Sequence, residues 1–428
     1  MRISLLLKRE PFGLILEKTL EKFLTVKHGV IHQVHWHSGW NRKSLIFGSE
    51  TWLCNSNLNA IFLPRAKKAI LLPVIQEFSR STTAWRTPLQ RLYVALATAP
   101  VISSLFANAM IEISPQIADA SQVLILGGNH HIRFLDYRNN RCFVIAKVGF
   151  NLAFIANEIR VRRKNPDVPA PAILEVADDF SWYSEALIQG TPANRMRKGK
   201  QVDSNIGRLM KSFFTFLKET AVDAFVNEYT HTLTDRIDHH IDQDGLLGYQ
   251  LKEQLRRLVR ALEQIISETG EGIIVISQTH GDFQPANILI QGEHSWLIDW
   301  EYTAQRQIGY DALVYVLGSR FPKGLAERLN ALLHARESSA RHTLKDWPGL
   351  AWGETQERRR VLALFLLEEL ELKLMEMASP VFTRVPPSFE AFRQELEKCV
   401  EVLCGKECRR WNFAHRLRDK TDLVGSLG

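Results

Sequence analysis

The sequence lacks the cysteine pattern of a disulfide-stapled or zinc-binding protein. Its five cysteines are odd in number and include no Cys-x-x-Cys pair, which argues against both a disulfide framework and a zinc ribbon. Cys399, Cys404 and Cys408 lie close together on an expected helix, and we interpret them as ordinary half-buried thiols rather than a metal site. A reducing cytoplasm is the expected location.

A secretory signal and a clear membrane span are also lacking. The N-terminal apolar core is only five residues long before Lys8 and Arg9, too short for a signal peptide. The uncharged run from Leu92 to Ile111 contains Pro100, so we interpret it as a buried or surface helical hairpin broken there rather than a spanning helix. Peripheral membrane contact by the basic N-terminal third is an alternative that we do not favour.

The formal charge of +7 is spread over the whole chain, so it favours an anionic partner such as a nucleotide only weakly and gives no reason to infer nucleic-acid binding. A length of 428 residues predicts two or three packed units. Residues 1–118 carry no catalytic signature and are expected to form an N-terminal extension of unknown role.

Strand-like runs begin at residue 122. Three of them are separated by turns at Gly127-Gly128 and Asn139-Asn140, which predicts an antiparallel meander. A helix is expected from Leu152 to Arg163, followed by two more strands within residues 172–188. Five antiparallel strands with a helix after the third are the order of a protein-kinase-like small lobe, which we place at residues 119–190.

Residues 191–428 have a mostly helical pattern, including a continuous amphipathic stretch expected over residues 211–229. The exception is a loop and hairpin at residues 280–301. The predicted fold class is therefore α+β: a protein-kinase-like bilobal fold with a small antiparallel lobe, a helical large lobe and an extra N-terminal region.

The strongest chemical signal is the segment from His280 to Asn287, HGDFQPAN, followed by Asp299 in LIDWEY. Phosphoryl transfer needs a carboxylate near the attacking hydroxyl and oxygen ligands that hold Mg²⁺ against the phosphates. Asp282 follows a buried strand, whereas Asn287 and Asp299 flank the next hairpin, so the three can converge. The alternative is a polar loop in which Asp282 and Asn287 only form turns.

HGDFQPANIL followed by LIDWEY resembles the aminoglycoside phosphotransferase and choline kinase superfamily. The resemblance covers about residues 120–380 and is specific at this segment. It implies that Asp282 is the catalytic base, that Asn287 and Asp299 bind the metal, and that His280 braces the loop. The implied cofactors are ATP and Mg²⁺, and the implied reaction is transfer of the γ-phosphoryl group to a hydroxyl of a sugar, aminoglycoside or amino alcohol.

The expected nucleotide site continues in the small lobe. Lys147 interrupts an apolar strand on the face that it shares with Phe143 and Ile145, and we expect it to pair with Glu158 and contact the phosphates. The alternative is an edge-strand lysine that reaches solvent. Gly127 and Gly128 would let backbone amides approach phosphate, unless they form only a plain turn. By position, Leu187 and Gln189 resemble the hinge that reads adenine.

Other features stay outside the predicted site. His130-His131 and His239-His240 are adjacent pairs whose side chains diverge, so neither suggests a metal site. The acidic residues Glu368, Glu369 and Glu371 are expected on a solvated helix face, with a cationic substrate pocket as the alternative. A non-catalytic kinase-like nucleotide-binding scaffold is the rival function. The sequence does not reveal the acceptor, the oligomeric state or a preference for ATP over GTP.

Overall fold

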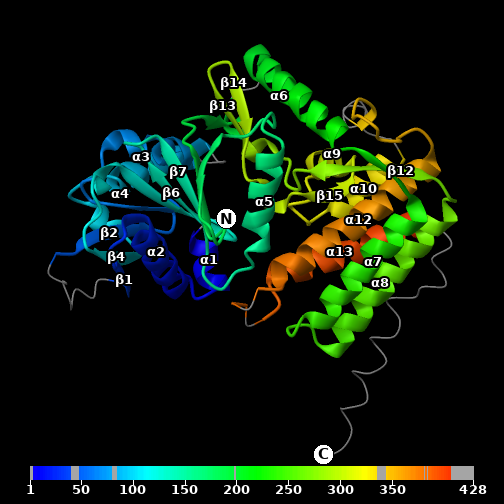
Figure 1. Ribbon diagram of the computed structural model, residues 1–428, viewed down its shortest axis with the longest axis horizontal. Helices are drawn as coiled ribbons and strands as arrows, with labels where there is room; N and C mark the ends of the chain where they lie inside the picture. The colour runs from blue at the N-terminus through cyan, green and yellow to red at the C-terminus, as the bar shows by residue number, and fades with distance from the viewer. Residues whose placement is uncertain are drawn as a thin grey trace, which may run out of the picture. The chain divides into compact units, whose positions relative to one another are not determined.

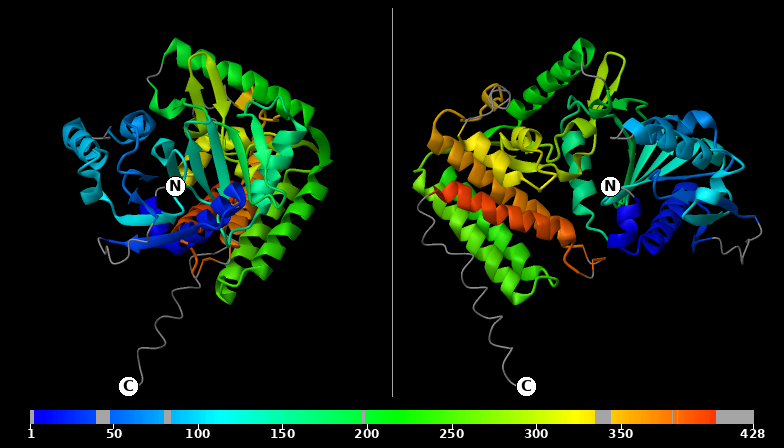
Figure 2. Two further views of the ribbon diagram at one scale, coloured as in Figure 1. Left: turned by 60° about the vertical axis from the view of Figure 1, so that its left-hand side comes forward. Right: turned by 180° about the vertical axis from the view of Figure 1, so that it is seen from behind.

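The computed structural model describes residues 3–39, 48–79, 84–196, 199–334, 344–379, 381–382 and 384–405. The chain divides into two compact units (Figures 1 and 2). Unit 1 contains Met1–Glu219, His280–Ala304 and Ala378–Arg384, whereas unit 2 contains Thr220–Thr279, Gln305–Met377 and Val385–Gly428. The boundary expected near residue 118 lies inside unit 1. Residues His280–Ala304, which include the segment predicted to be catalytic, belong to the unit that holds the N-terminal sheet.

Unit 1 combines a large sheet, a small sheet and six helices among its described residues. The strands are β1 (Gln33–Ser38), β2 (Glu50–Asn55), β3 (Ala60–Phe62), β4 (Ala109–Ser114), β5 (Val123–Gly127), β6 (His131–Asp136), β7 (Arg141–Ala146), β8 (Ile173–Val176), β9 (Trp182–Ala186), β10 (Thr191–Pro192), β13 (Ile288–Gln291) and β14 (His294–Leu297). The helices are α1 (Ile3–Arg9), α2 (Phe12–His28), α3 (Lys68–Phe78), α4 (Thr87–Ala97), α5 (Ala153–Lys164) and α6 (Lys200–Glu219).

Within the described part of unit 1, nine strands form one sheet in the order β1-β4-β2-β3-β5-β6-β7-β9-β8. The antiparallel strands β5-β6-β7-β9-β8, with α5 between β7 and β8, confirm the predicted protein-kinase-like small lobe. The N-terminal strands extend this sheet, because β3 pairs with β5 through Ala60–Leu126 and Ile61–Ile125. This pairing satisfies backbone groups that would otherwise be exposed at the edge of β5.

The two faces of the sheet are covered by different helices (Figure 1). Alternate residues of a strand point to opposite faces. On β7, Phe143 and Ile145 belong to the large core that contains α1 and α2, and Phe23 of α2 lies 5.3 Å from Phe143 between ring centroids. Val144 and Ala146 instead pack with α5. The turn before β7 uses Asn140 at a φ of 52°, a conformation that asparagine tolerates.

The uncharged run at residues 92–111 is broken near Pro100, as predicted. Helix α4 ends at Ala97, and the chain continues through a short 3₁₀ turn, η2 (Ser103–Phe106), into strand β4. The second arm is therefore a turn and a strand rather than a helix. Among the residues that the structure describes, no helix is both long enough and apolar enough to cross a membrane.

Unit 2 is mostly helical, as expected. Its elements are β11 (Val222–Phe225), α7 (Val226–Gln243), α8 (Tyr249–Glu268), β12 (Ile273–Thr279), β15 (Ala304–Gln307), α9 (Tyr310–Leu317), α10 (Leu325–Leu333), α12 (Thr355–Met377) and α13 (Pro387–Cys404). The continuous helix expected over residues 211–229 is wrong, because β11 interrupts it and pairs with β12. Cys399 and Cys404 lie on α13, whereas Cys408 lies outside the described residues.

The expectation of a solvated acidic face on α12 is also wrong. Glu368, Glu369 and Glu371 are buried, since α12 packs against α7, α8 and α13. Glu368 accepts hydrogen bonds from the Tyr229 hydroxyl at 2.6 Å and from the Gln307 amide at 2.7 Å. Buried carboxylates need such donors. These residues form part of the polar core of unit 2.

Candidate active site

The segment from His280 to Asp299 in unit 1 is organised around His280. The His280 ring is fully buried, with Nε2 3.0 Å from the carbonyl oxygen of Ile298, and its Nδ1 accepts the backbone N–H of Asp282 at 3.1 Å. These contacts assign the proton to Nε2. The ring links the loop that carries Asp282 to the chain just before Asp299, which is the geometry that a bracing role requires.

The structure requires a glycine at position 281. Its φ is +88°, and a Cβ atom there would lie 2.1 Å from the carbonyl oxygen of Tyr302. Any side chain would therefore force the loop away from the segment that follows Asp299. Because Gly281 has no side chain, the loop and this segment can lie in close contact.

The side chains of Asp282 and Asn287 are directly hydrogen-bonded. The Asn287 side-chain amide donates to the Asp282 carbonyl oxygen at 2.9 Å and to its Oδ2 at 2.8 Å. Gln284 donates to the same Oδ2 at 2.9 Å. The loop between them closes through a 3₁₀ turn, η5 (Pro285–Asn287), which brings the two residues together. Two amide donors thus orient the Asp282 carboxylate.

Asp299 follows β14 in the left-handed backbone region, with φ 71°, which aspartate tolerates better than most residues. Its side chain is 30% exposed and lies 3.3 Å from Arg133 Nη2 and 3.5 Å from His131 Nε2. Burial acts to raise the pKa of Asp299, but Arg133 and His131 outweigh it and lower the pKa to about 2. Asp299 is therefore a carboxylate at neutral pH.

His131 joins Asp299 to a second carboxylate. Its Nδ1 lies 2.9 Å from Glu301 Oε2, and one ligand atom from each of His131, Asp299 and Glu301 falls within 4.8 Å of the others. Burial lowers the pKa of His131 to about 4, although Asp299 acts in the opposite direction. His131 therefore lies between the carboxylates of Asp299 and Glu301.

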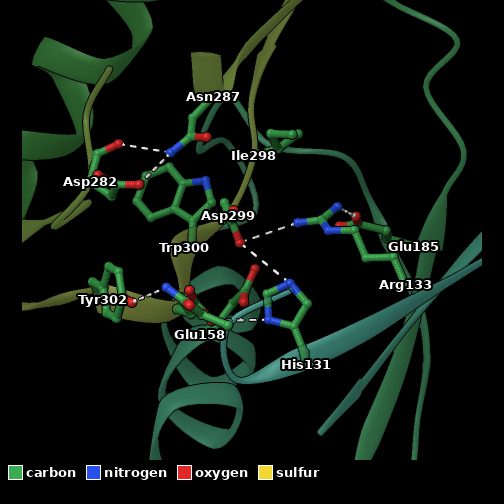
Figure 3. Close-up of polar contacts among 12 residues, drawn as sticks. His131, Arg133, Glu158, Glu185, Asp282, Asn287, Ile298, Asp299, Trp300 and Tyr302 are labelled. Carbon is green, nitrogen blue, oxygen red and sulfur yellow. Dashed lines mark hydrogen bonds and ion pairs between the residues drawn. The ribbon is translucent and has the colours of Figure 1, made fainter. Parts of the chain in front are cut away.

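A chain of alternating charges runs from α5 to Asp299 (Figure 3). Arg162 donates to Glu158 and to Glu185, both at 2.8 Å. Glu185 in turn lies 3.6 Å from Arg133, which contacts Asp299. Each carboxylate in this buried chain has a guanidinium partner, as burial of charge requires. The guanidinium of Arg133 is therefore positioned beside Asp299 by residues of β9 and α5.

The expected pair between Lys147 and Glu158 does not form. Lys147 Nζ donates to Glu10 Oε1 at 2.6 Å and to the Asn129 carbonyl oxygen at 2.8 Å, whereas Glu158 accepts from Arg162 and, at 2.7 Å, from the Tyr183 hydroxyl. Lys147 does share a face with Ile145, but α1 and α2 cover that face. Burial lowers the pKa of Lys147 to about 8, although Glu10 acts in the opposite direction.

Of the two glycines of the first hairpin, Gly127 faces the N-terminal helices and Gly128 faces His131 of the same hairpin. A Cβ on Gly127 would lie 2.9 Å from Ile3, and one on Gly128 would lie 2.7 Å from the carbonyl oxygen of His131. Both positions thus require close approach of the backbone. After β9, the Leu187 amide donates to the Asn140 carbonyl at 3.0 Å, while Gln189 is exposed just before β10. None of these contacts tests a role in nucleotide binding.

Two residues of this site, Arg133 and His131, were not predicted from the sequence. They alternate on β6, opposite Val144 and Ala146 in the pairing with β7, and so point to the face that α5 covers. The adjacent His130 packs its ring against Phe154 of α5 and Tyr302, with ring centroids 4.4 and 5.8 Å apart, whereas His131 contacts Asp299 and Glu301. The alternation of His131 and Arg133 along a strand was the available signal.

Residues 151–352 match the model of a family described as "Phosphotransferase enzyme family". The match covers just under half of the chain. The predicted resemblance is confirmed, and the chain is a phosphotransferase. The matched range contains Asp282, Asn287 and Asp299 but begins after Lys147.

The phosphotransferase is similar to several solved structures at low identity. A choline/ethanolamine kinase family protein from Mesorhizobium loti is 16% identical, with 77% of this chain and 99% of that chain covered and a TM-score of 0.44. A choline kinase from Streptococcus pneumoniae is 11% identical, with 68% and 92% covered and a TM-score of 0.40. An aminoglycoside phosphotransferase from Streptomyces rimosus is 16% identical, with 58% and 91% covered and a TM-score of 0.37. No curated protein sequence matches this chain.

Proposed function

We propose that this phosphotransferase moves the γ-phosphoryl group of ATP, with Mg²⁺, to a hydroxyl of a small molecule such as a sugar, an aminoglycoside or an amino alcohol. The observation that carries the proposal is the hydrogen bond between Asn287 and Asp282. His280 links the loop that contains both residues to the chain just before Asp299. The residues with the required chemistry are thereby held on one scaffold.

The donor set fits a magnesium ion. Mg²⁺ takes oxygen ligands and keeps several waters, so one amide oxygen and one carboxylate are a sufficient share from the protein. Asp299 is held ionised, with its pKa at about 2. Asn287 directs its Nδ2 to Asp282, which leaves its Oδ1 as the ligand atom. When bound, the metal would neutralise charge on the phosphates.

Asp282 would orient the acceptor hydroxyl and take its proton. In phosphoryl transfer the protein mainly positions the reactants and stabilises charge, so the orientation of this carboxylate is its main contribution. The hydrogen bonds from Asn287 and Gln284 both reach Oδ2. These two hydrogen bonds restrain the orientation of the carboxylate.

We assign the phosphate-binding cation to Arg133 rather than to Lys147. Arg133 shares the site with Asp299 and presents several N–H donors that match phosphate oxygens. Glu158 then acts indirectly, through Arg162 and Glu185. Gly127, Gly128, Leu187 and Gln189 stay proposed contacts to the nucleotide: the glycines beside the phosphates, and Leu187 and Gln189 at the adenine through backbone groups.

The test is Mg²⁺-dependent ATP consumption by the purified chain against a panel of sugars, aminoglycosides, choline and ethanolamine. Stimulation by one acceptor is expected. Asp282→Asn should lower turnover at least about a hundredfold while ATP binding persists, because a general base contributes about that much. Asp299→Ala should abolish the metal dependence together with turnover.

Asp178→Asn is the matched control, since Asp178 is an exposed aspartate in the same unit. Its turnover should equal that of the unchanged chain. If ATP binds but no acceptor is phosphorylated, the rival function of a nucleotide-binding scaffold is favoured. If Asp282→Asn retains turnover, the role of Asp282 is wrong.

A further inference from the structure

The segment from Thr51 to Ile111 has an unusual charge pattern. Six of its residues are basic and one, Glu77, is acidic. Glu77 lies 2.7 Å from Arg195 in an ion pair. Between Phe78 and Ile111 no acidic residue occurs at all. Arg65 forms an ion pair with Glu50, whereas Lys67, Lys68, Arg86 and Arg91 are exposed and give the described part of this segment a positive charge.

The same segment exposes a group of large apolar side chains. We call it the α4 surface; it comprises Trp85, Leu89, Leu92, Val101, Ile102 and Leu105. Trp85 is 65% exposed, Leu89 63% and Val101 88%. Leu89 and Leu92 are three residues apart on one face of α4, whereas Val94 and Ala97 on another face are buried in the core. Helix α4 thus carries apolar side chains on its outer face as well as on the face that packs into the core.

The exposed apolar residues lie on adjoining segments. Helix α4 packs against η2, and the Tyr93 and Phe106 rings of these two elements are 5.6 Å apart. Helix α3 lies beside α4 (Figure 1). Apolar groups gathered on connected segments mark an interaction surface more often than isolated exposed residues do.

Basic side chains flank the α4 surface. Arg86 and Arg91 of the α4 region are exposed, as are Lys67 and Lys68 at the start of α3. The Arg86 guanidinium lies 4.8 Å from the centre of the Trp85 ring. Tryptophan and arginine side by side suit the boundary between an apolar layer and charged headgroups, where an aromatic ring and a cation find different partners.

We propose that the α4 surface binds peripherally to a lipid bilayer that carries anionic headgroups. Exposed leucine, valine and tryptophan side chains would enter the interfacial layer, and the flanking lysines and arginines would contact the headgroups. A second copy of the chain fits less well, because a two-fold symmetric contact through this surface would bring Arg86 and Arg91 against their own counterparts. The proposal is independent of the reaction assigned to the chain.

Flotation of the purified full chain with vesicles tests the proposal. Vesicles of phosphatidylcholine with about 30% phosphatidylglycerol should bind the chain, and pure phosphatidylcholine vesicles should bind it at least about tenfold less. High salt should weaken binding, because it screens headgroup charge. Leu89→Ser with Leu92→Ser, and separately Arg86→Gln with Arg91→Gln, should each reduce binding about tenfold.

Matched controls separate this surface from exposure and charge in general. Ile31→Ser changes a residue that is 78% exposed elsewhere in unit 1, and Arg163→Gln with Lys164→Gln removes two exposed charges from α5. Both controls should bind vesicles like the unchanged chain. Thermal melts of all variants establish that they fold. As a second measurement, brominated lipids should quench part of the tryptophan fluorescence of the unchanged chain. This quenching should be lost in the Trp85→Phe variant.

Three outcomes would overturn the proposal: no binding to anionic vesicles, equal loss in the control variants, or no quenching that depends on Trp85. Light scattering after size exclusion tests the other occupant. If the chain is a dimer that the Leu89 and Leu92 variant dissociates, the α4 surface is an interface between copies and the lipid proposal is wrong.

Discussion

Two cations lie on opposite faces of the same sheet, and their surroundings differ. Lys147 and Glu10 form an ion pair in which both side chains are fully buried. Arg133 and Asp299 form a longer contact in which the side chains are 18% and 30% exposed. The first pair fastens the helix α1 region to β7, whereas the second borders the catalytic segment.

This difference is the reason to expect that Arg133 is a better phosphate ligand than Lys147. A phosphate ligand has to exchange partners when the nucleotide binds, and a loosely held, partly exposed guanidinium can do so at less cost than a fully enclosed ammonium. The aromatic rings of Phe12 and Phe150 lie about Lys147, at 5.5 and 4.9 Å from Nζ. Their packing leaves Lys147 enclosed.

The largest expected effect is on the fully buried ion pair between Lys147 and Glu10. Glu10→Ala should destabilise unit 1 by about 3–5 kcal/mol, because it leaves a buried ammonium without its carboxylate. Lys147→Met should cost less, since an apolar side chain of similar size replaces the charge and Glu10 also contacts Arg9 at 2.8 Å. The measurement is the midpoint and slope of urea unfolding.

The double variant Glu10→Gln with Lys147→Met serves as the control for this prediction, because it removes both charges together. It should be more stable than Glu10→Ala. If Lys147→Met instead leaves the unfolding midpoint unchanged and weakens ATP binding, then Lys147 is the phosphate ligand and the assignment to Arg133 is wrong.

A smaller effect is expected at the partly exposed pair of Arg133 and Asp299. It should appear in the binding of ATP rather than in the stability of the fold. Arg133→Met should raise the KM for ATP about tenfold to a hundredfold, since a hydrogen bond to a charged group is worth about 1.5–3 kcal/mol. Arg133→Lys should recover part of the loss, because a point charge replaces a fork of donors. Steady-state kinetics at varied ATP measures this.

A merely structural role for Arg133 makes a different prediction. The unfolding midpoint would then fall in Arg133→Met, and Arg133→Lys would not restore the KM. Glu185→Gln adds a further test, because it removes a carboxylate that positions Arg133 and should raise the KM for ATP less than Arg133→Met does.

The sequence was most informative where local spacing fixes structure. The order of strands β5 to β9, the position of α5 and the break at Pro100 all follow from turn residues and periodicity. The alternation along β7 also placed Lys147 with Phe143 and Ile145. What alternation cannot reveal is which face of the sheet receives which helices, because that depends on α1 and α2, more than a hundred residues earlier in the chain.

The same limit explains the acidic residues of α12. Glu368, Glu369 and Glu371 would be a solvated face on an isolated helix, but other helices pack against α12, and distant segments supply the partners Tyr229, Arg236 and Arg320. Likewise, β11 forms because β12 lies beside it. Tertiary partners, rather than local preferences, decide such residues.

The smallest effect is expected at a pair that resembles Lys147–Glu10 in distance alone. Lys22 of α2 contacts Asp179 at 2.8 Å, but the two side chains are 51% and 53% exposed. Lys22→Ala should change the free energy of unfolding by less than about 1 kcal/mol, because water solvates both groups when the pair separates. Urea unfolding at low and high salt measures it. A change as large as that of Glu10→Ala would mean that distance rather than burial sets the contribution of ion pairs in this sheet. The different surroundings of Lys147 and Arg133 would then not explain a difference in their contributions to stability.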